Sequence, residues 1–304
     1  MATEKNFMNL PKEYRDKDKS KVVILPISFK IKTTRENDAH LGPSAIINAS
    51  EDLEYFDEDS FTEPYEKGIF TDNLLDIKEK EAPKITQVIL DKVTKLPKNQ
   101  FPIILGSDHF TTVGVIKGME KRNKEEFGII VFDAHSDLRT PWGKDTWWHA
   151  CVSNLVSKDH KTLLVGTRSM DYYDIEYLQS KEGQNVGLIF AKDLLSSQKA
   201  HNWDLASCFE LEEKLRQLPK KIYISIDVDV FDPSIIRYTD TPEPGGLNWT
   251  QTNNLLKKIF EEKEVIGVDL VEYSPDTKNK ASFCESFTLA KLVYKIISYK
   301  FNTK

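Results

Sequence analysis

The chain has 304 residues, a formal charge of −6 at pH 7 and a sequence pI near 5.7. This acidic balance, with Lys and Arg scattered along the chain, excludes the basic surface of a nucleic-acid-binding protein. No stretch approaches the roughly 18 apolar residues of a membrane-spanning helix, and the first residues lack the apolar core of a secretory signal. We therefore expect a soluble, cytoplasmic protein with neither nucleic-acid nor membrane partners.

The predicted elements alternate between strand and helix along the chain. Residues 21–26 indicate a buried strand, a helical pattern runs from 42 to 56, residues 57–72 predict a loop, and a second helix fits 78–96. Apolar runs of strand length then predict six further buried strands, at 101–105, 128–132, 162–165, 186–190, 222–226 and 265–270.

This alternation predicts an α/β fold, a three-layer α/β/α sandwich with a central, mostly parallel sheet. No repeat or Pro/Gly-rich linker marks a boundary, so residues 1–304 are expected to form a single domain. Residues 1–20 are polar and are predicted to be a flexible or peripheral N-terminal segment. In such sheets, ligands collect beyond the carboxyl ends of the strands.

The three cysteines offer neither a disulfide framework nor a zinc site. Cys151, Cys208 and Cys284 are odd in number, far apart and without a C-x-x-C pair. We expect all three to be buried, reduced thiols.

Two motifs place metal-competent side chains at alternate positions, each directly after a predicted strand. They are Asp133, His135 and Asp137 in one motif and Asp227 and Asp229 in the other. On an extended chain alternate side chains point the same way, so each set is expected to converge. Buried acids that close together would repel one another without a cation.

A third motif, Gly106-Ser107-Asp108-His109, follows a further strand and adds His109 as the sixth candidate ligand. A lone histidine at a strand end is more often hydrogen-bonded structure than a ligand, but the three motifs together predict a two-metal site. Four carboxylates and two imidazoles without a thiolate suit Mn²⁺ better than structural Zn²⁺ or Mg²⁺, and Co, Ni or Fe could substitute.

The three motifs, in this order and spacing, resemble the ureohydrolase family of arginases, agmatinases and their relatives. The family pattern runs Gly-Gly-Asp-His, then Asp-Ala-His-x-Asp, then Ser-x-Asp-x-Asp-x-x-Asp-Pro. The similarity covers most of the chain, is greatest to archaeal agmatinase-like proteins, and extends to segments 42–46, 165–169, 241–246 and 269–275. It implies a hydrolase that cleaves a guanidino group to urea and an amine with two Mn²⁺ per chain.

The resemblance also implies that the six ligands form two overlapping sets that share two bridging carboxylates, Asp133 and Asp227. The first set is His109, Asp133, Asp137 and Asp227, and the second is Asp133, His135, Asp227 and Asp229. A metal pair about 3.5 to 4 Å apart lowers the pKa of a shared water, which then attacks the guanidinium carbon. Asp137 is expected to take part in catalysis as well.

Two further residues match catalytic positions of the family. Glu272 matches the glutamate that orients the guanidinium, for which a planar carboxylate is a bidentate partner; an ordinary strand-end acid is the alternative interpretation. His149 stands where the family carries a mobile histidine that passes protons to the leaving amine; a buried structural histidine is its alternative. Asp108 could orient a metal ligand, and Asp232 is expected to hold its own loop before Pro233.

The chain departs from the family pattern where substrates are selected. Ser107 replaces a glycine, and residues 237–240 replace a run of small residues with bulky and charged ones. The Asn/Ser-rich loop with which arginases contact the α-amino and carboxylate groups of the substrate is missing, and aromatic residues between 138 and 148 take its place. The candidate substrate contacts are therefore Arg139, Trp148, Asp240, Thr241 and Glu272.

The leading expectation is an agmatinase that converts agmatine to putrescine, with Asp240 near the distal ammonium. Arg139 argues for a carboxylate-bearing substrate instead, as in an arginase or a guanidinobutyrase. Two other classes stay open: a deacetylase-like amidohydrolase with a single zinc ion, and a non-catalytic relative that binds a guanidine. The resemblance further implies a homo-oligomer, a trimer or a hexamer.

Overall fold

One sheet runs through the computed structural model, which describes residues 5–30, 38–140, 148–196, 206–279 and 281–302. Within these residues the sheet has nine strands, and all of its strand pairs are parallel. Their order is β2-β1-β4-β9-β8-β5-β6-β7, with β3 paired to β1. The predicted mostly parallel sheet is confirmed, and its strands are β1 (Val22–Ser28), β2 (Ile69–Thr71), β3 (Leu75–Asp76), β4 (Phe101–Leu105), β5 (Phe127–Phe132), β6 (Thr162–Thr167), β7 (Val186–Phe190), β8 (Lys221–Asp227) and β9 (Glu264–Val271).

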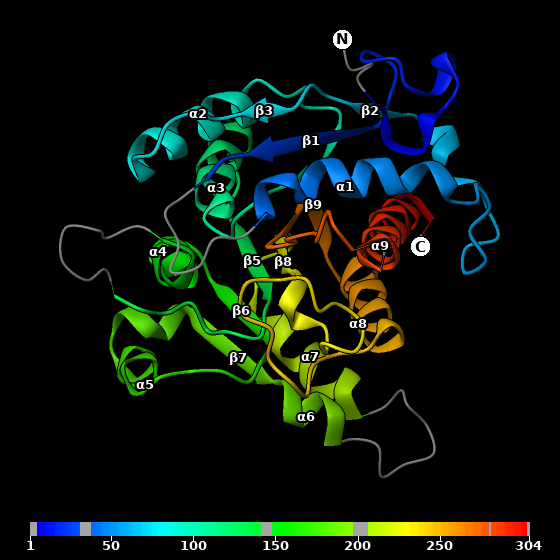
Figure 1. Ribbon diagram of the computed structural model, residues 1–304. Helices are drawn as coiled ribbons and strands as arrows, with labels where there is room; N and C mark the ends of the chain where they lie inside the picture. Colours follow the sequence, from blue (N-terminus) through cyan, green and yellow to red (C-terminus); the bar gives the residue numbers. More distant parts are fainter. Residues whose placement is uncertain (1–4, 31–37, 141–147, 197–205, 280, 303–304) are drawn as a thin grey trace.

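Helices cover both faces of the sheet and complete the predicted three layers. Alternate strand residues point to opposite faces: in β5, Ile130 and Phe132 join one core cluster and Ile129 and Val131 join the other. Figure 1 shows α8 and α9 on the side of the sheet opposite α3 and α4. The helices are α1 (Gly42–Ala49), α2 (Ala82–Thr94), α3 (Thr111–Arg122), α4 (Val152–Ser157), α5 (Tyr172–Gln179), α6 (Ala191–Ser196), α7 (Ala206–Gln217), α8 (Trp249–Glu262) and α9 (Ser282–Asn302).

The predicted loop at 57–72 is wrong in part, because it contains the edge strand β2. That strand has three residues, Ile69–Thr71, which pair in parallel with Val22–Ile24 of β1. Three residues are too few to show the period-two pattern on which a strand is predicted. Its place at the sheet edge is set by a partner almost 50 positions away, which local pattern does not reveal.

The expectation of a flexible or peripheral N-terminal segment does not hold for residues 7–10. Phe7, Met8 and Leu10 are buried in one of the two core clusters. The backbone N–H of Phe7 donates to Thr71 Oγ1 over 2.9 Å, and that of Met8 donates to Ser50 Oγ over 2.7 Å. This segment is therefore attached to both the sheet edge and the end of the first helical segment.

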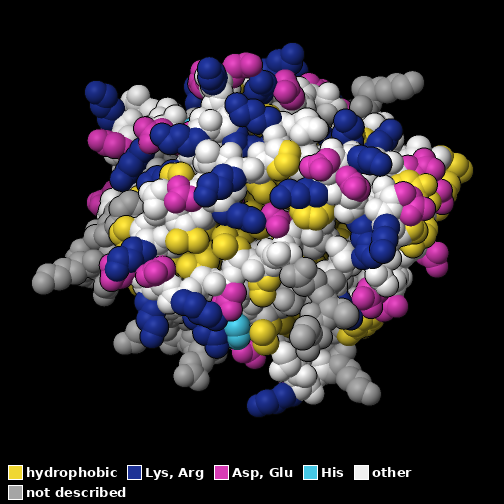
Figure 2. All heavy atoms as spheres, turned by 90° about the horizontal axis from the view of Figure 1, so that it is seen from above, with side chains coloured by type: hydrophobic (Ala, Val, Ile, Leu, Met, Phe, Trp, Pro, Cys, Tyr) yellow, Lys and Arg dark blue, Asp and Glu magenta, His cyan; other side chains and the backbone are white. Residues whose placement is uncertain are grey.

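The prediction of three buried thiols is also wrong in part. Cys151 is buried, but Cys284 is exposed on α9, and the side chain of Cys208 lies outside the described residues. Figure 2 shows Lys and Arg interspersed with Asp and Glu over one face of the molecule. Among the helices described, none combines the length and apolarity required to cross a membrane.

Candidate metal centre and substrate pocket

Four adjacent strands, in the order β4-β9-β8-β5, bring the predicted motifs to one edge of the sheet. The first candidate set gathers around one ring nitrogen. His109 Nδ1 lies 3.2 Å from Asp133 Oδ2, 3.0 Å from Asp137 Oδ2 and 3.4 Å from Asp227 Oδ2. All four side chains are at least nine-tenths buried.

The second candidate set adjoins the first. His135 Nδ1 lies 2.9 Å from Asp229 Oδ2 and 3.6 Å from Asp133 Oδ1. Asp133 is common to both groups of side chains that are close enough to share an ion, whereas Asp227 falls in the group of His109. The structure thus brings all six predicted ligands together, and the bridging role of Asp227 stays a prediction.

Turns bring these side chains together. The expectation that they converge because alternate side chains of an extended chain point the same way is therefore wrong. β5 ends at Phe132, and the first carboxylate after it folds back: Asp133 Oδ1 accepts the backbone N–H of His135 over 2.6 Å. After β8 a 3-10 turn follows, in which Asp227 Oδ1 accepts the backbone N–H of Asp229 over 2.9 Å. Side chains two positions apart in the sequence therefore still face a common point.

A hydrogen-bonded relay behind His109 fixes the direction of its ligand nitrogen. Ser225 Oγ donates to Asp269 Oδ1 over 2.6 Å, so it accepts from His109 Nε2, which lies 3.1 Å away. A neutral imidazole with its proton on Nε2 would direct the lone pair of Nδ1 at the three carboxylates. Ser225 and Asp269 were not assigned roles from the sequence, although both belong to segments that match the family pattern.

The electrostatics of the two sets fit bound cations. Burial, and then the charge of Asp133, raises the pKa of Asp137 and raises that of Asp229 to about 6. Burial and the neighbouring carboxylates raise the pKa of Asp227 well above its usual range. Among the described residues, the buried atoms His109 Nδ1 and Asp133 Oδ2 have no hydrogen-bond partner. Oxygen and imidazole donors in this arrangement match a divalent transition metal.

The amino-acid sequence matches the Arginase family over residues 20–298. The chain belongs to the arginase family. It is 28% identical to the N(1)-aminopropylagmatine ureohydrolase of Synechocystis sp., over 98% of this chain and 97% of that protein, and 30% identical to the agmatinase of Pyrococcus horikoshii, over 90% of each. Its fold is similar to the crystal structure of the agmatine ureohydrolase of Thermoplasma volcanium, with a TM-score of 0.79 and 22% identity over 99% of this chain and 95% of that one.

Membership of the arginase family identifies the chain as a hydrolase of the ureohydrolase class, as its motifs predict. Beside the metal sets stands a third group, Asp108, His149 and Glu272. His149 Nδ1 lies 3.7 Å from Asp108 Oδ2. Burial alone would lower the pKa of His149, but this carboxylate raises that pKa to about 9. Asp108 thus faces His149 rather than a metal ligand, which corrects the role expected for it.

In this arginase-family site Glu272 is held in an uncommon backbone conformation. Its φ is +66°, and Asp137 likewise has a φ of +50°, a region that costs a non-glycine residue about 1 to 3 kcal/mol. Glu272 Oε1 accepts the backbone N–H of His109 over 2.6 Å. Strain at a carboxylate that is fixed to a ligand residue indicates that its direction matters to the site.

A pocket of about 370 Å³ opens beside these groups. Every predicted substrate contact lines it, whereas Trp142 and Trp147, part of the expected aromatic segment, lie outside the described residues. Seven of the sixteen lining residues are acidic: Asp137, Asp171, Asp174, Asp227, Asp229, Asp240 and Glu272.

Arg139, which argued for an anionic substrate, and Arg237, from the segment that departs from the family pattern, are both paired with carboxylates. Arg139 Nε lies 3.1 Å from Asp171 Oδ2. Arg237 Nε lies 3.0 Å from Glu285 Oε1, and Arg237 is not among the lining residues of the pocket. Each guanidinium thus has a carboxylate partner, and of the two only Arg139 lines the pocket.

The acids at the start of α5 are site residues that the sequence analysis missed. Asp171 and Asp174 form a capping box, in which each side chain accepts the backbone N–H of the other residue. Asp174 Oδ2 also accepts from Ser136 Oγ over 2.7 Å. Its other oxygen, Oδ1, is buried without a hydrogen-bond partner in the described part of the chain. The Asp-x-x-Asp spacing before a helix was the available signal.

Two residues support the loops around the site. Asp232 holds its own loop as predicted, since its carboxylate accepts the backbone N–H groups of Ser234, Gly245 and Gly246. Arg168 donates to the carbonyls of Asp229 and Glu243, over 2.7 and 2.8 Å. The metal-ligand turn and the 241–246 segment are thereby fixed to each other.

Proposed function

We propose that this arginase-family enzyme uses two Mn²⁺ to cleave the guanidino group of a linear, cationic guanidine to urea and an amine. Agmatine, which would give putrescine, and its N(1)-aminopropyl derivative are the proposed substrates. The observation that carries this choice is the acidic pocket, in which Arg139, the only arginine among its described lining residues, is already paired with Asp171. The names of the relatives above support the same two compounds.

The six ligand residues would hold the two ions. Bound there, the ions would supply Lewis acidity and a water of lowered pKa. Asp133 would contact both ions, because it lies within reach of both histidines. The relay through Ser225 would keep His109 Nδ1 free of a proton.

The protein's own groups would then bind and orient the substrate. Glu272, fixed by the backbone of His109, would receive N–H groups of the guanidinium. His149, paired with Asp108 and lining the pocket, would carry a proton to the leaving amine. Asp174 Oδ1 and Asp240 offer negative charge to the distal ammonium groups.

The competing functions are less well supported. Arginine and 4-guanidinobutyrate carry a carboxylate that Asp174 and Asp240 would repel, the two pocket acids that are not assigned to an ion, to the guanidinium or to Arg139. A deacetylase-like enzyme needs a single zinc ion, whereas two overlapping groups of His and Asp are present. A non-catalytic guanidine-binding relative would have no use for a histidine placed beside the pocket and paired with Asp108.

Urea release from agmatine, N(1)-aminopropylagmatine, arginine and 4-guanidinobutyrate, measured in parallel with Mn²⁺, tests the proposal. We expect the two cationic guanidines to be cleaved and Asp133→Ala to abolish the reaction. Asp174→Asn should raise the KM for the cationic substrates about tenfold, the worth of a hydrogen bond to a charged group. Asp193→Asn, an exposed acid outside the pocket, is the matched control. Preference for arginine would overturn the substrate, and guanidine binding without urea release would overturn the activity.

A further inference from the structure

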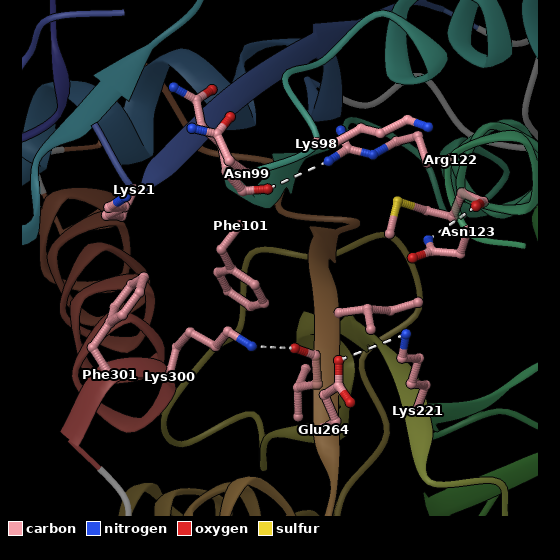
Figure 3. A pocket seen from close by; sticks show the side chains of 14 residues that line it. Lys21, Lys98, Asn99, Phe101, Arg122, Asn123, Lys221, Glu264, Lys300 and Phe301 are labelled. Carbon is pink, nitrogen blue, oxygen red and sulfur yellow. Dashed lines mark hydrogen bonds and ion pairs between the residues drawn. The ribbon is translucent and has the colours of Figure 1, made fainter. Parts of the chain in front are cut away.

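A second cavity lies at the opposite end of the sheet from the metal centre, and its character is basic. It has a volume of about 330 Å³ and lies at the first residues of β4, β8 and β9 and the last turns of α9, as Figure 3 shows. Its lining includes one carboxylate, Glu264, and five cationic side chains: Lys21, Lys98, Arg122, Lys221 and Lys300.

Most of this positive charge has no counter-charge among the described residues. Lys221 Nζ lies 3.0 Å from Glu125 Oε1 and 3.9 Å from Glu264 Oε1, so it is the cation to which the single lining carboxylate is paired. Lys300 Nζ donates to the carbonyl of Val265 over 2.7 Å and lies 5.0 Å from the centre of the Phe101 ring. Neither contact supplies a negative charge to Lys300.

Arg122 gives the cavity a buried donor. Its Nη2 donates to the carbonyls of Pro97 and Gln100, over 3.0 and 3.3 Å, which fixes the plane of the guanidinium. Its Nη1 is buried and has no partner in the part of the chain that the structure describes. Burial lowers the pKa of Arg122 and that of Lys300, because their charge is desolvated without full compensation.

A planar guanidinium with a spare donor, in a cavity that four lysines also line, matches the geometry of phosphate oxygens. Asn99 and Asn123 add amide groups to the lining, and Phe301 adds an aromatic wall. The volume exceeds that of an inorganic ion and lies within the range of small-molecule sites. The site is therefore larger than a phosphate group alone would need.

We propose that this cavity binds a small phosphate ester, with Lys98 and Arg122 at the phosphate group and Lys21, which Figure 3 shows across the cavity, adding positive charge to the same site. The inference is independent of the proposed function, because the two sites are separated by the length of β9 (Glu264–Val271), roughly 23 Å at the usual rise per residue. Glu264 begins that strand at the basic cavity, and Glu272 follows its end in the metal pocket. The strands β8 and β9 connect the two sites directly.

Isothermal titration of the full-length protein with ribose 5-phosphate tests this inference, with inorganic phosphate and succinate as comparison probes at constant ionic strength. We expect saturable binding of ribose 5-phosphate with a Kd of about 1 mM or below, and weaker binding of succinate. The double variant Lys21→Gln with Lys98→Gln removes two exposed cations and should weaken binding at least tenfold, about 1.4 kcal/mol. Lys158→Gln with Lys181→Gln changes two exposed lysines outside the cavity and is the matched control.

Two further measurements locate the bound anion. Asp133→Asn should leave the Kd of ribose 5-phosphate unchanged, and the Lys21/Lys98 variant should cleave guanidines as the wild type does. Loss of binding in Asp133→Asn would place the anion at the metal centre and overturn the inference. An unchanged Kd in the Lys21/Lys98 variant, or no saturation below about 10 mM, would overturn it too.

Discussion

The two ends of one sheet carry opposite charge. Beyond the carboxyl ends of β8 and β9 lies a pocket in which acids make up seven of sixteen lining residues. At the amino ends of the same strands lies a cavity with five cationic side chains and a single acid. Between these ends the two strands are mostly apolar, apart from the buried pair Ser225 and Asp269, so the contrast in charge arises from residues at and beyond the strand ends.

The charged side chains at the two ends of the sheet differ in burial as well as in the sign of their charge. Asp133, Asp227 and Asp229 are at most 3% exposed, whereas Lys21 and Lys98 at the other end are exposed. Buried like charges are costly without compensating ions, while exposed lysines are solvated and cost little. The acidic end should therefore depend on metal for its stability as well as its activity, and the basic end should affect neither strongly.

Removing a metal carboxylate gives the largest expected effect. Asp227→Asn should abolish urea release and also the stabilisation by Mn²⁺, which in the wild type reaches about 2.7 kcal/mol at a concentration 100 times the Kd. Unfolding by added urea as denaturant, with and without Mn²⁺, measures that difference in the free energy of unfolding. The exposed Asp159→Asn is the control. An Asp227→Asn protein that Mn²⁺ stabilises like the wild type would remove this residue from the ligand set.

Glu272→Gln should affect catalysis without affecting metal binding. The amide keeps the shape of the carboxylate but loses the charge that faces the guanidinium, so kcat/KM for agmatine should fall about 10²- to 10³-fold. Mn²⁺ stoichiometry, measured by metal analysis, should stay at two per chain. Loss of one Mn²⁺ equivalent together with activity would instead make Glu272 part of the metal site.

The relay behind His109 predicts a smaller, metal-specific effect. Ser225→Ala removes the acceptor that holds His109 Nε2, so Mn²⁺ affinity should fall about 10- to 100-fold, the usual cost of losing such a partner. Excess Mn²⁺ should restore most of kcat, which distinguishes a positioning residue from a catalytic one. A kcat that stays low at saturating Mn²⁺ would contradict this role.

These contacts show what the sequence could and could not predict. The six ligand residues follow predicted strands at short, regular spacing, so local pattern was sufficient to place them at one sheet edge. The partnership of Asp108 with His149, of Ser225 with His109 and of Arg139 with Asp171 joins residues 32 or more positions apart, which no local spacing reveals. The charges of Arg139 and Arg237 were visible in the sequence, but their neutralisation was not.

Away from the site, tertiary packing also gave two short segments a structure that their sequence pattern did not predict. Residues 7–10 have too short an apolar run to predict burial, yet Phe7, Met8 and Leu10 fill the core beneath the sheet edge. The edge strand β2, which carries Thr71, was missed for the same reason. Both errors concern short segments whose structure depends on partners distant in sequence.

The smallest expected effect, that of Arg139→Gln, is also the sharpest test of the acidic end. Arg139 and Asp171 are partly exposed, with side chains 53% and 34% accessible, so their ion pair is worth about 0 to 1 kcal/mol. Removing the cation leaves Asp171 free to attract a cationic substrate. The KM for agmatine should then fall up to about fivefold at low salt, and the gain should shrink as salt screens the pocket.

Activity toward arginine and 4-guanidinobutyrate decides between the two roles of Arg139. If it only neutralises Asp171, the low rates with these compounds should stay within about fivefold of wild type, because a partly exposed pair is worth little. If it anchors a substrate carboxylate, those rates should collapse while agmatine cleavage persists. That second result would place a working cationic site among the pocket acids, and the charge contrast between the two ends of the sheet would no longer predict which substrates the enzyme accepts.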